Sequence, residues 1–253
     1  MSDEPGYHNC KAVLATNICN LLCSLGPSTY NEIAPKIEYW IEYSLTEQFT
    51  TIDDLAERVS SVAWREHIPR WHISIFLKKF RGGSHCSEQA RTFIDELCFH
   101  ILRWFAVASA EDLLADSSKA LVSKGGGRGF LRAALFVGHL IKHGLLSREL
   151  VRRHLSKPLT THHYNDDNVV KQAVRARAIY NLFTVAENTL LQGFLEPEDV
   201  QVCFERLETG ISLGEIEGLP AFDVERLNVR CDSCLGASHQ NLTYGLAISR
   251  DPC

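Results

Sequence analysis

The chain has 253 residues, of which 45% are hydrophobic and 23% are charged, and its formal net charge is −5. This length and composition predict a folded protein with a hydrophobic core and exclude a disordered chain. The negative net charge argues against a protein that binds nucleic acid over its whole surface. No run approaches the roughly 20 uninterrupted apolar residues of a membrane span, and the polar, acidic start Met1-Ser2-Asp3-Glu4-Pro5 is not a secretory signal.

The number and positions of the cysteines indicate a reducing compartment. There are nine of them, an odd number, and Cys19, Cys23, Cys98 and Cys203 lie within apolar helical patterns. We therefore expect a soluble, intracellular protein with buried thiols in a reducing compartment, the cytoplasm or alternatively the nucleus.

In the first half of the chain, apolar residues recur at steps of three and four, which predicts helices. The segments expected to be helical are 14–25, 33–41, 55–62, 93–105 and 110–122. Thr29 with Glu32 and Thr51 with Asp54 have the spacing of helix N-caps, the first pair that of a capping box. The segment 71–80 is short and rich in β-branched and aromatic residues, so its sequence is compatible with either a helix or a strand. A loop is expected at 81–84.

The second half begins after a glycine run at 125–129. The run lacks the Gly-Lys-Ser/Thr ending of a phosphate-binding loop, so we interpret it as a flexible break at 123–129. The helix 130–146 that follows is apolar nearly all round, which is typical of a helix at the centre of a core.

Three further helices are expected. The first starts at the cap Ser147 and ends at Pro158; the second starts at 165–167 and ends before Gly193; the third carries the apolar positions of 200–207. Short connections between helices favour antiparallel neighbours. The sequence therefore predicts an all-α fold of stacked antiparallel helix pairs, a HEAT-like α-solenoid, over 1–208, with an irregular acidic tail at 209–253.

Charge is distributed unevenly along the chain. Residues 128–182 contain ten Lys/Arg and three Asp/Glu, whereas residues 183–253 contain four and twelve. Arg148 and Arg152, like Lys171 and Arg175, are four positions apart and share a helix face. We predict a basic ridge that binds RNA or an acidic partner, with a solvated face neutralised by the acidic end as the alternative. Its residues are Arg148, Arg152, Arg153, Lys157, Lys171, Arg175 and Arg177.

The run 129–151 carries a family resemblance. Its segment Phe136-Val137-Gly138-His139-Leu140-Ile141 and the turn Gly144-Leu145-Leu146-Ser147 resemble the signature helix pair of the middle domain of translation initiation factor 4 gamma. The sequence departs from that family in having His139 where an acidic residue is usual. The resemblance implies a crescent of paired helices that acts as a scaffold in translation or messenger-RNA metabolism and binds a DEAD-box RNA helicase, RNA, or both.

Two groups of metal-ligand residue types were weighed. Cys231, Cys234 and His239 have the first three spacings of a zinc knuckle, but Tyr244 stands where the fourth ligand is expected. His139 and His143 are one helical turn apart, with neither a Glu at the second position nor an evident third ligand. We interpret the cysteines as free thiols and the histidines as polar positions on a core helix, and predict no metal or cofactor.

The expected function is that of a non-enzymatic scaffold that binds a protein partner, such as a DEAD-box helicase, with no membrane association and no small-molecule substrate. One alternative is direct RNA binding by the basic ridge. The other is a metal- or thiol-dependent enzyme, which is not the main expectation because no nucleophile and base stand out as a pair in the sequence.

Overall fold

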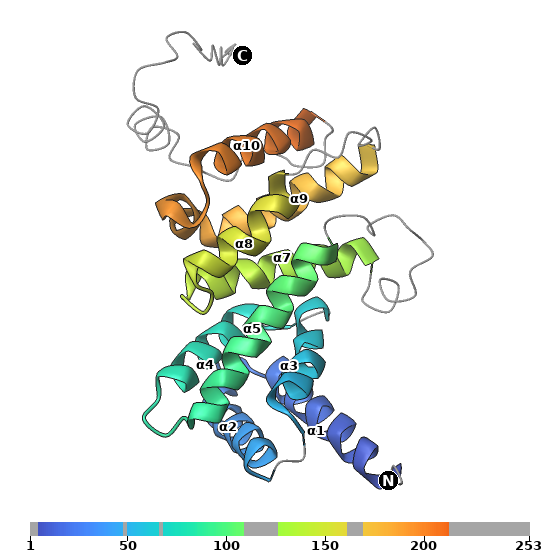
Figure 1. Ribbon diagram of the computed structural model, residues 1–253, viewed down its shortest axis with the longest axis vertical. Helices are drawn as coiled ribbons and strands as arrows, with labels where there is room; N and C mark the ends of the chain where they lie inside the picture. Colours follow the sequence, from blue (N-terminus) through green and yellow to red (C-terminus); the bar gives the residue numbers. More distant parts are fainter. Residues whose placement is uncertain (1–4, 48–49, 66–67, 109–125, 161–168, 213–253) are drawn as a thin grey trace. The chain divides into compact units, whose positions relative to one another are not determined.

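A computed structural model of the chain describes residues 5–47, 50–65, 68–108, 126–160 and 169–212. Internal contacts divide the chain into two units, 1–220 and 221–253, and all described residues belong to the first. The described part consists of helices (Figure 1). The α-helices are α1 Pro5–Cys23, α2 Tyr30–Thr46, α3 Ile52–Ser60, α4 Arg70–Gly82, α5 Glu88–Ala108, α7 Gly126–Lys142, α8 Arg148–Thr160, α9 Val169–Thr189 and α10 Pro197–Ser212. Two single turns complete them, the 3-10 turn η1 Ser61–Trp64 and the π-helical turn η2 Leu190–Phe194.

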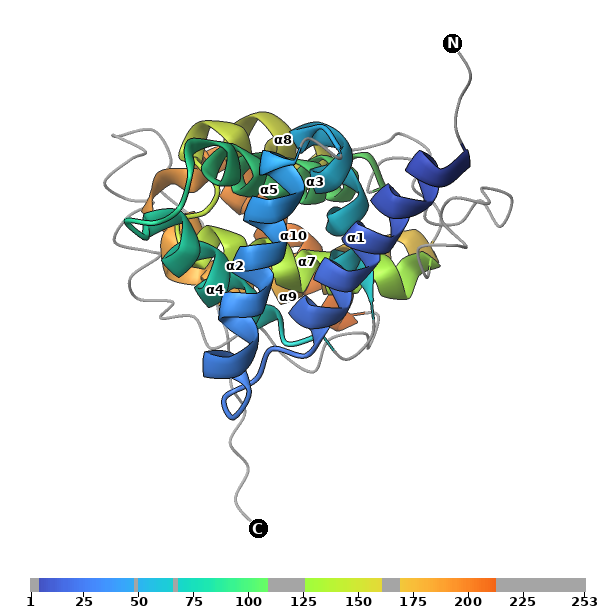
Figure 2. The same ribbon diagram turned by 90° about the horizontal axis from the view of Figure 1, so that it is seen from below.

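Packing around α5 organises the first half of the described chain. Helix α5 contacts α2, α3 and α4, and its other neighbours are α7 and α8 (Figure 1). Helices α1 and α2 lie side by side, nearest the viewer in Figure 2. The stacked rings of Phe105 and Phe130, with centroids 4.7 Å apart, join α5 to α7. Fully buried aromatic and aliphatic side chains therefore form one continuous core across both halves.

Helix α7 is the apolar helix that the sequence predicts at the centre of a core, and it packs against α4, α5, α9 and η1. Gly138 allows the close approach of α7 to α9, because a Cβ there would lie 3.1 Å from the Val185 Cβ and 3.3 Å from the Leu182 carbonyl oxygen. The helix starts at Gly126, inside the predicted flexible glycine run.

The all-α class is confirmed, because the described residues contain helices and no strand. The solenoid arrangement stays a prediction. Its simplest form would pack each helix mainly on the next, whereas the most extensive contacts here join α3 to α5 and α7 to α9. No helix among the described residues is long and apolar enough to span a membrane.

The predicted helix ends were confirmed in some places and wrong in others. Thr51 accepts a hydrogen bond from the Asp54 backbone N–H at 3.1 Å, as a cap should. The Thr29 capping box is wrong: the Thr29 hydroxyl donates backwards to the Ser24 carbonyl at 2.7 Å and caps nothing. Pro158 does not end α8, which continues to Thr160.

Other predictions concern segment type and boundaries. The ambiguous segment 71–80 is helical, within α4, because its apolar side chains meet the core at helical spacing. Helix α10 extends to Ser212, past the predicted boundary at 208. The predicted helix 110–122, the start at 165–167 and the tail from 213 lie outside the described residues.

The thiols match the sequence interpretation. Cys19, Cys98 and Cys203 are buried and free, and Cys23 is half-buried and free. Burial raises the pKa of Cys98 and of Cys203 to about 12, so both thiols stay protonated at neutral pH.

Candidate functional site

Two of the predicted basic residues, Arg148 and Arg152, meet at η2, the turn that follows α9. Arg148 donates to the carbonyl oxygens of Gly193 and of Gln192, the latter from Nη2 at 3.1 Å. Arg152 Nη2 donates to the same Gly193 oxygen at 3.0 Å, and its Nη1 lies 2.7 Å from Glu196 Oε1. The predicted common face of these two arginines is thus confirmed. The guanidinium N–H groups of both arginines bond to other groups of this chain.

The end of η2 explains this arrangement. Carbonyl groups in the last turn of a helix lack intrahelical partners and carry partial negative charge. Gly193 has φ 97°, the left-handed conformation that ends a helix, and a Cβ there would collide with the Arg148 guanidinium. The arginines therefore cap this helix end and fasten α8 to it. We call Arg148, Arg152, Gly193 and Glu196 the arginine cap.

The remaining basic residues lie in different settings. Arg153 forms an exposed pair with Glu149 at 2.8 Å, Arg177 is exposed, and Arg175 is buried at 6% exposure. The structure does not describe the side chains of Lys157 and Lys171. Helix α8 packs on α5, α10 and η2, and α9 packs on α7 and α10. Arg175 is therefore not part of an exposed ridge. Partner binding by the others stays a prediction.

A second cationic region lies where α4 packs on α7. Arg70, the first residue of α4, donates from Nε to the Arg132 carbonyl and from Nη2 to the Arg65 carbonyl, both at 3.2 Å. These bonds hold the start of α4 against α7. Burial and the nearby Arg132 lower the pKa of Arg70 to about 10, so it remains charged at neutral pH.

Trp71 follows Arg70 and is 41% exposed, although it is among the largest apolar side chains of the protein. Its ring centroid lies 4.7 Å from that of His143 and 5.8 Å from that of His139, both edge to face. Lys142 Nζ lies 5.0 Å from the Trp71 ring centroid, within cation–π range. We call Trp71, Lys78, Lys142 and His143 the Trp71 surface.

The electrostatics of this surface are one-sided. The pKa of His139 is lowered to about 4, mainly by burial and further by the nearby His143, Lys142 and Arg70. Burial, Lys78 and Lys142 also lower the pKa of His143. Every charged neighbour in these shifts is a cation. The sequence gives the reason: α4 contains four Lys/Arg and α7 three, and neither helix contains an Asp or Glu.

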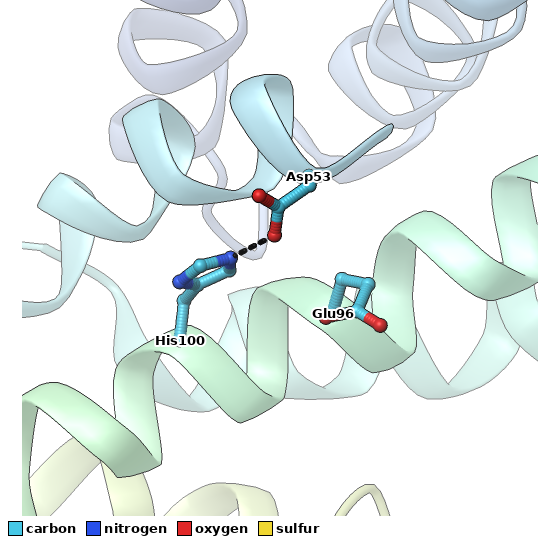
Figure 3. Close-up of side chains that lie close together, drawn as sticks. All are labelled: Asp53, Glu96 and His100. Atoms are coloured by element: carbon cyan, nitrogen blue, oxygen red, sulfur yellow. Dashed lines mark hydrogen bonds and ion pairs between the residues drawn. The ribbon is translucent and has the colours of Figure 1, made fainter. Parts of the chain in front are cut away.

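A third group contains metal-ligand residue types. Among the described residues, one group brings three such side chains together: Asp53 in the first turn of α3 and Glu96 and His100 on α5 (Figure 3). Their ligand atoms all lie within 4.8 Å of one another, and His100 Nε2 lies 2.8 Å from Asp53 Oδ1. His139 and His143, interpreted from the sequence as polar positions and not as metal ligands, belong to no such group within the described chain, and the Cys231, Cys234 and His239 group lies outside it.

Comparison with known proteins identifies no relative. No protein-family model matches the chain, and searches of curated proteins and of solved structures find no match. The resemblance of 129–151 to the initiation-factor middle domain therefore stays a prediction, and the functional argument rests on the residues of this chain.

The sequence interpretation missed both the Trp71 surface and the Asp53 group. A signal for the first was present, since segments 70–82 and 126–143 contain no acidic residue. The four-residue spacing of Glu96 and His100 was also visible. The contribution of Asp53, 43 positions before Glu96, depends on the packing of α3 against α5.

Proposed function

We propose that this chain is a non-enzymatic helical scaffold that binds an acidic segment of a protein partner at the Trp71 surface. The observation that carries the proposal is an exposed tryptophan on a rigid support, surrounded by cations that no described carboxylate neutralises. Lys78 and Lys142 form no ion pair with a carboxylate of the described residues.

The side chains suit such binding. Tryptophan is enriched among the residues that contribute most to protein interfaces, because its large ring is desolvated on contact and loses little conformational entropy. Arg70 bonds the start of α4 to α7, and His143 of α7 contacts the Trp71 ring, so little ordering remains to oppose association. Lys78 and Lys142 attract carboxylates, which steers the partner and favours acidic over basic segments.

The contacts that the Trp71 ring already makes with α7 favour a protein partner over RNA. Single-stranded RNA binding uses aromatic faces on which bases stack. Here His143 and Lys142 of α7 already contact the Trp71 ring, which leaves less of it open to a base. The setting in translation or messenger-RNA metabolism that the resemblance implies is compatible with this proposal and is not required by it.

The test is titration of the full chain with a synthetic acidic peptide that contains an aromatic residue, alongside single-stranded polyuridine. We expect the peptide to bind and the affinity to fall with salt. Trp71→Ala should weaken binding about 30-fold, and the double variant Lys78→Met, Lys142→Met about 10-fold. Tyr39→Ala is the matched control, because Tyr39 is an exposed aromatic residue on another helix, α2.

Three results would decide against the proposal. Binding of polyuridine that Trp71→Ala abolishes, with no peptide binding, would assign the surface to RNA. Equal loss in Trp71→Ala and Tyr39→Ala would show a nonspecific effect, and no binding of either ligand would remove the surface as a docking site. A pull-down with and without ribonuclease, comparing the parent with Trp71→Ala, then identifies the natural partner.

A further inference from the structure

We infer that Asp53, Glu96 and His100 form a binding site for a divalent transition-metal ion of the zinc type, which joins α3 to α5. This site is separate from the Trp71 surface and does not depend on the proposed function. Figure 3 shows the His100 imidazole directed at Asp53 of α3, with Glu96 beside them on α5.

The positions of the three donors are fixed by the fold. The cap between Thr51 and Asp54 sets the first turn of α3 and therefore the place of Asp53. Glu96 and His100 are four residues apart on α5, so they lie on one face of that helix. The extensive packing of α3 against α5 holds the two helices together, and Leu55 and Val59 of α3 are fully buried.

The charges favour a cation between the donors. Two carboxylates lie with oxygens within 4.8 Å of each other, and like charges at this distance repel. His100 partners Asp53, but Glu96 is half-buried and makes no hydrogen bond or ion pair with the described residues. A bound cation would neutralise Glu96 and would take the place of the direct contact between His100 and Asp53.

The donor types select the class of metal. Imidazole nitrogen with two carboxylate oxygens suits Zn²⁺ and its first-row neighbours, whereas Mg²⁺ prefers an all-oxygen octahedron with several waters. Donors around zinc lie about 3.3 Å apart, so small rotations of these side chains bring them to ligand distance. Asp53 is largely exposed, which leaves the remaining coordination position to water.

The experiment is a zinc titration of the full chain by calorimetry, carried out in a Cys231→Ser, Cys234→Ser background that removes competing thiols. We expect one zinc ion per chain, and no comparable binding of Mg²⁺. At a zinc concentration 100 times Kd, the melting temperature should rise by roughly 5 to 10 °C, because the ion binds the folded state.

Glu96→Gln is the decisive variant. It keeps the contact between His100 and Asp53 and removes the repulsion between the two carboxylates, so the metal-free melting temperature should not fall, while zinc affinity should fall at least 10-fold. Asp53→Asn and His100→Ala should reduce zinc affinity by a similar factor, and His85→Ala, which removes an exposed histidine elsewhere, should leave it unchanged. Zinc affinity in Glu96→Gln equal to that of the parent, or no zinc binding at all, would leave an ordinary ion pair between α3 and α5 and would overturn the site.

Discussion

The arginine cap and the Trp71 surface are both rich in positive charge but use it differently. At the cap, Arg148 and Arg152 direct their donors at the carbonyl groups of Gln192 and Gly193, and Arg152 also pairs with Glu196. At the Trp71 surface, two acid-free helices face each other and the lysines have no described anionic partner. Positive charge is therefore bonded within the fold in the first region, whereas in the second region the lysines have no described carboxylate partner.

The largest expected effect is at Gly193. Gly193→Ala imposes a left-handed conformation on an L-residue and displaces Arg148, so we expect a loss of roughly 2–4 kcal/mol and a fall of about 10 °C in melting temperature. Thermal unfolding followed by circular dichroism measures it. Gly82→Ala is the control, because a Cβ at Gly82 meets nothing within 4 Å. Equal stability of both variants would show that the cap contributes little.

A charge-removal pair separates the two regions directly. Arg152→Met leaves the Gly193 carbonyl and Glu196 without this donor and should cost about 1–2 kcal/mol. Lys142→Met removes an exposed charge that has no ion pair and lies in cation–π range of Trp71, so it should cost no more than about 0.5–1 kcal/mol. Urea denaturation of both variants gives the comparison. A Lys142→Met variant destabilised as much as Arg152→Met would mean that the Trp71 surface also depends on its charge to fold.

Acid should destabilise the protein through the Trp71 region, because protonation of His139 is disfavoured in the folded state. The pKa of His139 is about 4 when folded and near 6.5 when unfolded. The unfolded chain therefore binds the proton more readily, so the stabilising effect is complete above pH 6.5 and is lost as pH falls from 6.5 to 4. We expect the loss of folding stability to be on the order of 1–2 kcal/mol, after a discount for solvent screening. His139→Gln should reduce this loss when denaturation is measured at pH 7 and pH 4.5, whereas Arg152→Met should retain it.

The smallest effect is on the titration of His143. Burial, Lys78 and Lys142, in that order, lower the pKa of His143, so Lys142→Met should raise that pKa part of the way towards its ordinary value. Imidazole proton shifts followed by NMR against pH measure it. Arg152→Met should leave the His143 titration unchanged, and a change there would mean that the two regions are electrostatically coupled.

Local signals in the sequence predicted much of the fold. Helical periodicity identified α7 as an apolar helix at the centre of a core and placed Arg148 and Arg152 on one face of α8. Thr51 was identified as a cap because its partner, Asp54, is three residues away. Thr29 has a similar signal and fails, because its hydroxyl bonds to the preceding turn at Ser24 instead.

The candidate sites were less predictable. Net charge along the chain pointed to residues 128–182 but could not separate buried Arg175 from exposed Lys142, since exposure depends on which helices cover which. Nor could it show that Trp71 meets His143, 72 positions later in the chain.

The sequence by itself determined that the described chain is helical, where α3 and α8 begin, and that a helix ends at Gly193, because these features depend on residues within a few positions of one another. Tertiary structure decided which cations stabilise the fold and which face outward, and it brought Asp53 to Glu96 and His100. The physical reason is that exposure and long-range contact are properties of packed surfaces, which residues near in sequence do not specify.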